Sequence, residues 1–385
     1  MINAERAASI QEGGRILSLD VLRGFALFGI LMVNILDFSG PVLYRPSIVH
    51  SNEWGDRTAE ILVFVFAQAS FYPLFAFLFG AGGVMFYRRL EEKGLPAEHY
   101  FARRLTGLLM IGAVHAFLIW HGDILISYAL IGLLFMLFVR RSPGTLAVWG
   151  VLMIAVPSAI LAVLLGAAGG FPVHEPSLSP VTEVYQSGSF GEIMQQRADD
   201  YFYVNNPVNA PFLVLSILPM FLLGGYAMKK GWFGQKPPLH LYRTWMTIAA
   251  VSGPAALAIK SMPLFMPGDG VWMYLHQSAG GPLLSFFYIT AILLAVSRFP
   301  ELHIYRYLAL TGRASMSNYL LQSIVCTLIF YSYGLGLYGK WSSLQAILAG
   351  ITVYLLLASV SSLWFKHYRQ GPAERWWRWF IYQKR

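Results

Sequence analysis

The residues best suited to chemistry in this chain are His121 and Asp123, which lie two positions apart in a short polar turn. An imidazole beside a carboxylate can serve as a general base toward an alcohol or an amine, or as a transient acyl carrier. We therefore interpret His121 as a catalytic candidate that Asp123 orients or polarises. The alternative is that these two residues only form a polar turn at the end of a helix. Their spacing implies no serine or cysteine nucleophile.

A second candidate group lies on one face of the apolar segment 17–38. At 100° per residue, Asp20, Arg23 and Asn34 fall within about 60° of one another. Asp20 and Arg23 are three positions apart, so they can neutralise each other and fix the helix end. The alternative is that Arg23, with Asp20 beside it, binds an anionic group.

The apolar segment 315–333 repeats this pattern. Arg313 precedes it, and Asn318 and Gln322 share one of its faces. Polar side chains in a membrane bundle often only hydrogen-bond between helices. Together with Arg23, however, Arg313 predicts a wall that binds phosphate.

Two further polar residues are expected on the side of an acceptor substrate. Asn34 lies about 21 Å beyond Asp20 along an ideal helix. His115 lies about 9 Å deeper than His121 on the same predicted helix and is expected to point elsewhere. A hydrogen-bonded core histidine is the simpler interpretation of His115, and contact with an acceptor is the functional one.

The elements that must position these residues are membrane spans. The chain is 56% hydrophobic and 12% charged, with a mean hydropathy of +0.54, whereas soluble domains carry about 25% charged residues. The single cysteine, Cys326, lies in an apolar run and excludes an internal disulfide. The sequence has no metal-ligand spacing and no glycine-rich phosphate loop, so no metal is expected.

Apolar runs of about 20 residues predict spanning helices, and the fold class is therefore an all-α, polytopic transmembrane bundle. The whole chain, 1–385, is expected to form one membrane domain, with an outer segment at 167–210 and a tail at 367–385. Within the outer segment, 192–200 could form a short surface helix, and the segment is expected to cap the bundle or to line a substrate entrance. Five spans on each side of it suggest two five-helix halves. The ten predicted spans are 17–38, 60–87, 104–121, 124–140, 145–166, 211–229, 241–261, 282–298, 315–333 and 342–366.

The distribution of basic residues orients this bundle. If the N-terminus is cytoplasmic, most lysines and arginines fall on the cytoplasmic side, as the positive-inside rule requires. Both termini are therefore expected to be cytoplasmic, and the net charge of +9 reflects orientation and not nucleic-acid binding. The basic residues expected on the outer side are Arg45, Arg57, Arg197 and Lys340, with Lys260 at a helix edge.

Three local patterns add expectations. The small residues of 79–83 favour close helix approach, and Tyr72-Pro73 is expected to kink the second span. In the tail, Trp376, Trp377 and their arginine neighbours suit a helix that lies in the membrane interface. The alternative for this helix is a lid over a cytoplasmic pocket.

Four motifs together resemble the YeiB family of bacterial membrane proteins, and the resemblance spans nearly the whole chain. In chain order, the motifs are Ser18–Phe25 (SLDVLRGF), His121–Leu125 (HGDIL) with Tyr128-Ala129-Leu130, Gly312-Arg313 with Ser317-Asn318-Tyr319 and Gln322-Ser323, and Gly371–Glu374 (GPAE) with Trp377-Arg378.

That family is grouped with the transmembrane acyltransferase superfamily, which includes heparan-α-glucosaminide N-acetyltransferase and shares the Leu-Asp-x-x-Arg-Gly opening. The resemblance implies an acyl-CoA donor bound from the cytoplasm and transfer to an acceptor across or within the membrane. We then expect His121, oriented by Asp123, to activate the acceptor. The expected donor-binding residues are Asp20, Arg23 and Arg313 with the basic pair Arg103-Arg104 for the phosphates, and Asn318 and Gln322 for the pantetheine-like arm.

We therefore expect an acyltransferase of the bacterial inner membrane whose acceptor is a lipid- or glycan-borne hydroxyl or amine. Its expected partners are membrane lipid, the acyl donor and the acceptor, with no nucleic acid. The rival functions are a transporter or flippase for an amphipathic anion, and a lipid-binding protein without catalysis. Broken helices at matching positions would favour a transporter, whereas a closed bundle with His121 at the end of a cytoplasmic tunnel would favour transfer.

Overall fold

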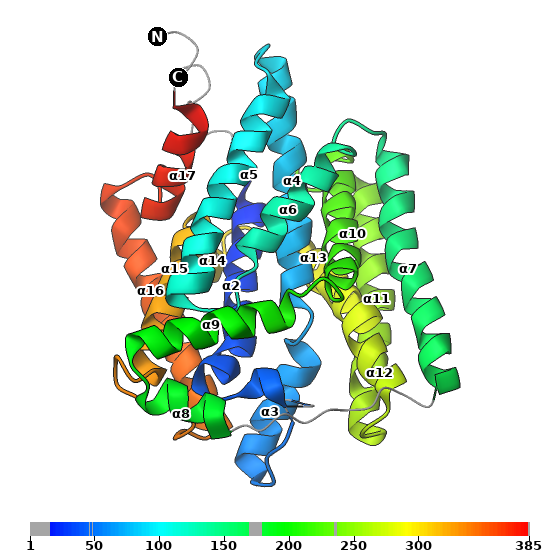
Figure 1. Cartoon of the computed structure of the whole chain (residues 1–385). Coiled ribbons are helices and arrows are strands. Elements are labelled where there is room, and N and C mark those ends of the chain that lie inside the picture. Colours follow the sequence, from blue (N-terminus) through cyan, green and yellow to red (C-terminus); the bar gives the residue numbers. More distant parts are fainter. Residues whose placement is uncertain (1–15, 46, 48, 169–178, 235–236, 384–385) are drawn as a thin grey trace.

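The computed structural model describes residues 16–45, 47, 49–168, 179–234 and 237–383, and throughout that part of the chain the regular elements are helices (Figure 1). Eight helical stretches are long and apolar enough to cross a membrane, and two shorter apolar helices accompany them. Their positions match the ten predicted spans, which confirms the polytopic helical bundle of an integral membrane protein. Five of the long stretches are single helices: Leu17–Ser39 (α2), Pro143–Ala168 (α7), Ala210–Lys229 (α10), Leu239–Phe265 (α11) and Ser343–His367 (α16). Three are composite: Trp54–Glu92 contains α3 (Trp54–Phe66) and α4 (Phe71–Glu92), Ala97–Ile119 contains α5 (Ala97–Val114) and the π-helical turn η3 (His115–Ile119), and Gly270–Arg298 contains α12 (Gly270–Leu275), the π-helical turn η4 (His276–Gly280) and α13 (Gly281–Arg298). The shorter apolar helices are Leu125–Met136 (α6) and Ser315–Phe330 (α15).

Four more helices and a short 3-10 turn are not long or apolar enough to span. One of them, α14, was not predicted, because its 11 residues mix charged and apolar side chains and so give no hydropathy signal. Its buried face packs against α2, which makes it part of the bundle wall. These elements are η2 (Val42–Tyr44), α8 (Ser179–Ser187), α9 (Phe190–Val204), α14 (His303–Arg313) and α17 (Pro372–Tyr382).

The second predicted span is broken into two helices. α3 ends at Phe66 and α4 begins at Phe71, and between them Ala69 has a φ of 58°. The kink expected at Tyr72-Pro73 is therefore wrong. Pro73 lies in the first turn of α4, where its missing N–H leaves no hydrogen bond unmade. The π-helical turn η4 interrupts another span, and a Cβ on Gly281 directly after it would lie 2.1 Å from the Ala69 carbonyl oxygen, so the two interruptions touch.

Glycines set the two closest helix crossings. A Cβ on Gly24 of α2 would lie 2.0 Å from the Leu308 carbonyl oxygen. A Cβ on Gly312 of α14 would lie 1.9 Å from the Asp20 carbonyl oxygen. In the same way, α4 and α10 meet at Gly80 and Gly224. Backbone contact of this kind is what small residues permit in membranes, and it confirms the packing role predicted for 79–83.

The first five spans do not form a unit apart from the last five. α4 packs most extensively against α10, and α2 packs against α14, α16 and α15. The expected division into two five-helix halves is therefore wrong. The division relied on chain order, whereas the glycine crossings join helices from opposite sides of the outer segment.

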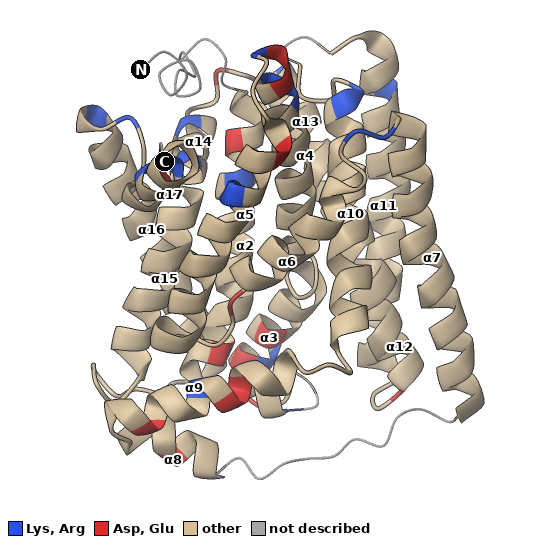
Figure 2. Ribbon diagram, turned by 45° about the horizontal axis from the view of Figure 1, so that its top comes forward, with Lys and Arg blue, Asp and Glu red and all other residues tan. Residues whose placement is uncertain are grey.

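The bundle has two chemically different ends. Most lysines and arginines lie at the end where α2 begins, α4 ends and α17 is found, which we call the basic end (Figure 2). At the other end, α8 and α9 lie across the bundle, and we call it the capped end (Figure 1). α9 buries Arg197 and Asp200, so the predicted surface helix is a cap whose polar side chains enter the bundle.

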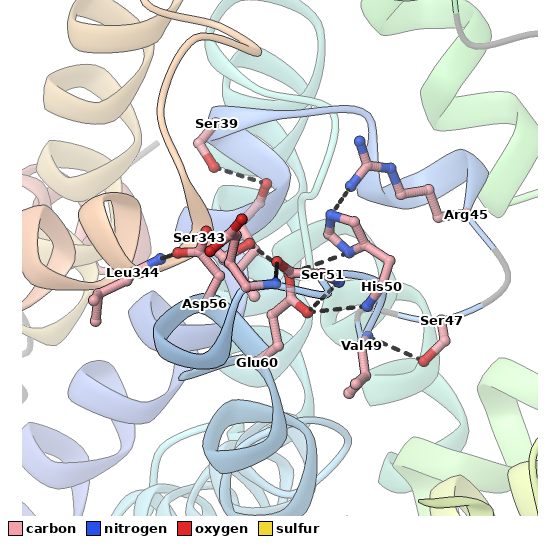
Figure 3. A network of polar contacts seen from close by, with 12 residues as sticks. Ser39, Arg45, Ser47, Val49, His50, Ser51, Asp56, Glu60, Ser343 and Leu344 are labelled. Atoms are coloured by element: carbon pink, nitrogen blue, oxygen red, sulfur yellow. Dashed lines mark hydrogen bonds and ion pairs between the residues drawn. The ribbon is translucent and has the colours of Figure 1, made fainter. Parts of the chain in front are cut away.

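A polar network ties down the chain at the capped end (Figure 3). Glu60 of α3 is fully buried and accepts hydrogen bonds from the backbone N–H groups of His50 and Ser51, both at 2.9 Å. It also accepts from the Ser343 hydroxyl at 2.7 Å. A buried carboxylate is tolerated when donors surround it in this way, and the network holds the stretch after α2 against α3 and α16.

Candidate functional site

A cavity of about 820 Å³ extends from the basic end into the bundle, within the range of small-molecule sites. Its outer part is strongly basic, and the described residues that line it include two carboxylates, Asp20 and Glu374. The basic lining residues are Arg23, Arg89, Lys93, Arg104, Arg313, Arg369 and Arg378.

Two of these guanidinium groups converge on one point of the cavity wall. A Cβ placed on Gly82 of α4 would lie 3.8 Å from Arg23 Nη2 and 3.9 Å from Arg104 Nη2. Asp20 pairs with Arg23 at 2.9 Å, so the predicted i, i+3 pair is present and Arg23 still reaches the cavity. Like charges that converge beside a glycine with no side chain make a site for an anion with several oxygens.

The inner part of the cavity is apolar and aromatic. Phe79 stacks under Arg104, whose Cζ lies 5.4 Å from the ring centroid. This lining suits an amphipathic anion, with its charge at the basic end and its apolar or neutral part deeper in the bundle. The other inner lining residues include Ile30, Phe75, Leu78, Leu108, Ile124, Leu125 and Tyr128.

The tail helix α17 forms part of the cavity wall. Trp377 donates a hydrogen bond to the Arg104 carbonyl oxygen at 2.9 Å, and its ring lies 5.0 Å from Arg104 Cζ. Glu374 accepts from the N–H groups of Met316 and Ser317 at the start of α15. Burial raises the pKa of Glu374, although these hydrogen bonds oppose the shift. Of the two alternatives for this helix, the structure therefore favours the lid, while Trp376 and Trp379 remain exposed on the other side.

The predicted donor-binding residues divide into two groups. Asp20, Arg23 and Arg313 line the cavity as expected. Asn318 and Gln322 do not belong to the cavity lining given by the described residues, so the cavity does not support their predicted contact with the donor. Asn318 instead donates to Thr311 O and Ser361 Oγ, both at 2.9 Å. Asn318 thus points toward α14 and α16, and sequence periodicity cannot reveal which neighbour a face meets.

The inner end of the cavity reaches the turn that carries the histidine motif. Tyr319 lines the cavity, and its hydroxyl donates to the Gly122 carbonyl oxygen at 3.1 Å. Its ring centroid is 4.9 Å from that of His115. Tyr319 is thus a shared wall between the cavity and a buried cluster of histidines and carboxylates.

Asp123 pairs with His115 and not with His121, which corrects the expected catalytic pair. His115 Nδ1 lies 2.8 Å from Asp123 Oδ2, and His115 Nε2 lies 2.8 Å from Ser323 Oγ. The reason is the π-helical turn η3, after which Trp120 is extended and the chain doubles back. This reversal brings Asp123 beside the histidine eight positions earlier.

His121 takes two other carboxylates. Its Nε2 lies 3.0 Å from Asp37 Oδ2, and its Nδ1 lies 3.5 Å from Asp200 Oδ2 without a hydrogen bond among the described residues. Burial alone would lower the pKa of His121, and Arg197 acts in the same direction, but Asp37 and Asp200 outweigh both and raise it. The residue is 6% exposed, so a free imidazole nitrogen is enclosed at the capped end.

Sequence reasoning missed Asp200 and Ser323. Asp200 accepts from Tyr185 Oη at 2.6 Å and contacts Tyr44, which joins α9 to the rest of the cap. Its position in a polar surface pattern gave no sign of burial. Ser323 stood in a motif, but only the approach of α15 to η3 brings it to His115. Asn34 lies one turn before Asp37 on α2 and is half-buried.

A separate buried polar pair lies where the two interrupted spans meet. Lys260 Nζ donates to the Gln68 carbonyl oxygen at 2.7 Å and lies 3.1 Å from His276 Nε2. Both side chains are fully buried. Lys260 was expected at a helix edge, but α11 continues to Phe265 and encloses it. Within the described residues, no three histidine, cysteine or acidic side chains are grouped to hold a metal ion.

Comparison with known proteins identifies relatives along nearly the whole chain. A family model described as "Protein of unknown function (DUF418)" matches residues 227–384. The uncharacterised protein YxaH of Bacillus subtilis (strain 168) is 37% identical over 94% of this chain and 93% of its own length. The uncharacterised protein YeiB of Escherichia coli (strain K12) is 29% identical over 94% and 95%. An uncharacterised 39.9 kDa protein of Bacillus acidopullulyticus, from the amylase 3' region, is 26% identical over 96% and 95%.

Proposed function

This chain belongs to the YeiB-like family of membrane proteins, and we propose that it is an acyltransferase of the bacterial inner membrane. It would move an acyl group from an acyl-CoA-type donor, held at the basic end, to a hydroxyl or amine of a lipid- or glycan-borne acceptor. The partners are the two substrates and membrane lipid.

One observation carries this proposal. The cavity is basic at its mouth and apolar deeper in, and its inner end meets the histidine turn through Tyr319. An acyl-CoA is an amphipathic anion with phosphates at one end and a reactive thioester at the other. When the phosphates lie against Arg23, Arg104 and Arg313, the thioester is directed toward the buried histidines.

The two ends of the bundle would then serve the two substrates. Arg23 and Arg104 bind phosphate oxygens beside Gly82, and the arm of the donor passes Phe79 and Tyr128. At the capped end, His121 Nδ1 can accept a hydrogen bond from the acceptor's hydroxyl or amine, while Nε2–H is held by Asp37. A histidine used in this way increases the nucleophilicity of the acceptor.

Donor binding is the first test. Loss of a charge-assisted hydrogen bond costs about 1.5–3 kcal/mol, so Arg23→Ala, Arg104→Ala and Arg313→Ala should each weaken binding of a non-hydrolysable acyl-CoA analogue by about 10- to 100-fold. The measurement is calorimetry on protein in nanodiscs. Arg306→Ala is the matched control, because Arg306 is an exposed arginine of α14 outside the cavity lining. Equal affinities in all four variants would contradict the donor site.

Transport of an amphipathic anion is the second candidate, and the interrupted spans favour it. The break between α3 and α4 touches the π-helical turn η4, beside the buried Lys260–His276 pair. Broken helices and intramembrane ionisable groups are features of transporters. Sealed vesicles loaded with labelled acyl-CoA separate the two functions: an acyltransferase moves the label to a new molecule, whereas a transporter moves the donor intact.

A further inference from the structure

Three buried side chains form a line that the proposed donor and acceptor sites do not use. Ser323 Oγ of α15 lies 2.8 Å from His115 Nε2, and His115 Nδ1 lies 2.8 Å from Asp123 Oδ2. With the proton on Nδ1, His115 donates to Asp123 and accepts from the Ser323 hydroxyl. This is the order of nucleophile, base and orienting carboxylate that activates a serine. Ser323 and His115 are 208 positions apart in the sequence, so the fold alone creates the arrangement.

Two buried N–H donors without partners belong to the same part of the bundle as this Ser323–His115–Asp123 line. Trp120 Nε1 and Gln322 Nε2 are buried and have no hydrogen-bond partner among the described residues. Trp120 packs near His115, with ring centroids 6.3 Å apart, and Gln322 precedes Ser323 in α15. Buried N–H groups without partners are costly, and a developing oxyanion in this part of the bundle would give such a donor a partner.

The line also lies directly behind the wall of the donor cavity. Tyr319 lines the cavity, its ring packs on His115, and its carbonyl oxygen lies 3.4 Å from Ser323 Oγ. Tyr319 therefore contacts both the cavity and the serine, and its side chain is the part that would have to move to admit a thioester. A rotation of this side chain would connect them.

We propose that Ser323 carries the acyl group as an ester between donor and acceptor. This inference rests on the proposed acyl transfer and adds a covalent step to it. In the first half, Ser323 Oγ attacks the thioester carbonyl carbon and its proton passes to His115 Nε2. The carbon–sulfur bond breaks, and the leaving thiolate takes that proton, which leaves a free thiol and an ester on Ser323.

In the second half, the acceptor oriented by His121 attacks the ester carbon. Its proton passes to His121 Nδ1, the bond from the ester carbon to Ser323 Oγ breaks, and Oγ takes up the proton that His121 then releases, by way of His115 Nε2. The product is an acylated acceptor and a restored serine. Because the thiol can leave before the acceptor binds, each substrate stays at its own end of the bundle.

The test uses the full chain in nanodiscs with a donor labelled in its acyl group and no acceptor. We expect one acyl group per chain, located on Ser323 by peptide mass spectrometry and stable to neutral hydroxylamine, as an oxygen ester is. Ser323→Ala should abolish this label and lower transfer at least 100-fold, while donor binding stays within twofold. Thr327→Val is the matched control, because Thr327 carries a buried hydroxyl one turn along α15 whose hydrogen bond goes to the backbone Ile324 O; it should label and transfer normally. His115→Gln should slow labelling at least 100-fold.

The outcomes separate this inference from the proposed function. Transfer by Ser323→Ala at the wild-type rate would overturn the covalent step and leave the acyltransferase intact. A label on Ser323 without transfer to any acceptor would support the activated serine and contradict the acyltransferase. Loss of transfer in Ser323→Ala that Ser323→Cys restores, with a label that hydroxylamine now removes, would establish a nucleophile at this position and exclude a merely structural hydroxyl.

Discussion

His115 and His121 lie six positions apart, and each has its own carboxylate. Asp123 holds His115 from the same turn, whereas Asp37 and Asp200 hold His121 from α2 and α9. Both nitrogens of His115 have partners in the structure, but His121 Nδ1 has no hydrogen bond to the part of the chain that the structure describes. The two residues are therefore suited to different tasks: His115 to relay a proton within the protein, and His121 to meet a molecule from outside.

The role of His121 leads to a prediction about rate and pH. His121→Ala should slow transfer by about 10²–10⁴-fold and leave donor affinity nearly unchanged. Because the carboxylates raise the pKa of His121, its neutral form appears only at higher pH. The wild-type rate should therefore rise with pH through a midpoint above 6.5, and Asp37→Asn should move that midpoint down.

Stability should change with pH in the opposite sense. A histidine with a raised pKa in the folded state stabilises the fold fully below its unfolded-state pKa, and this contribution is lost as pH rises through the folded-state value. The Tm of the wild type relative to His121→Gln should therefore decrease from pH 6 to pH 9. A rate that is flat across this range in the wild type would contradict the base role of His121.

The sequence predicted the arginines of the cavity wall better than the pairing of the histidines, and the reason is local. The exposure of Arg23 and Arg313 to one cavity depends on helix periodicity and on the basic side of the membrane, and both can be read along the chain. The pairing of Asp123 depends on a π-helical turn, and that of Ser323 depends on which helix α15 meets. Neither follows from the spacing of residues.

At the scale of elements, the glycines of two family motifs have a packing role. Gly24 and Gly312 let α2 and α14 touch backbone to backbone. This contact brings the Asp20–Arg23 pair and Arg313 to the same side of the cavity. The motif glycines thus position the arginines that follow or precede them.

This crossing gives a prediction about stability and donor binding. Gly312→Ala would put a Cβ 1.9 Å from the Asp20 carbonyl oxygen, so α14 must move away from α2. Overpacking of this kind costs about 1–3 kcal/mol, and the Tm in detergent should fall accordingly, with weaker binding of the acyl-CoA analogue. Gly144→Ala in the first turn of α7 meets only Ser142 Oγ, at 3.8 Å, and should change neither. An unchanged Tm for Gly312→Ala would refute the close crossing.

Hydropathy located the spans because their length and composition are a direct requirement of the bilayer. It did not locate α14, whose mixed composition is explained only by its packing on α2. It also missed the break between α3 and α4, because residues 67–70 (AQAS) contain neither proline nor glycine and are too few to interrupt the apolar signal around them. Both α14 and the break between α3 and α4 depend on tertiary contacts, which hydropathy along the sequence does not report.

At the scale of the whole molecule, charge and closure separate the two ends. The cavity lies at the basic end, whereas α8, α9 and the Glu60 network close the capped end (Figures 1 and 3). If the basic end faces the cytoplasm, a donor made in the cytoplasm reaches the cavity without crossing the membrane. The orientation of the bundle is thus a condition for the proposed function.

Cysteine labelling can test this orientation. The single cysteine, Cys326, is fully buried, so Cys326→Ala gives a background without reactive thiols. On that background, Ser187→Cys in the cap and Gln383→Cys after α17 each add one exposed site. A membrane-impermeant maleimide applied to intact bacterial cells should label Ser187→Cys, and it should label Gln383→Cys only after the membrane is opened. The positive-inside rule is the physical reason, because the arginines and lysines of the basic end resist translocation. The reverse pattern would place the cavity outside the cell, where no acyl-CoA is supplied, and would refute both the predicted topology and the proposed donor.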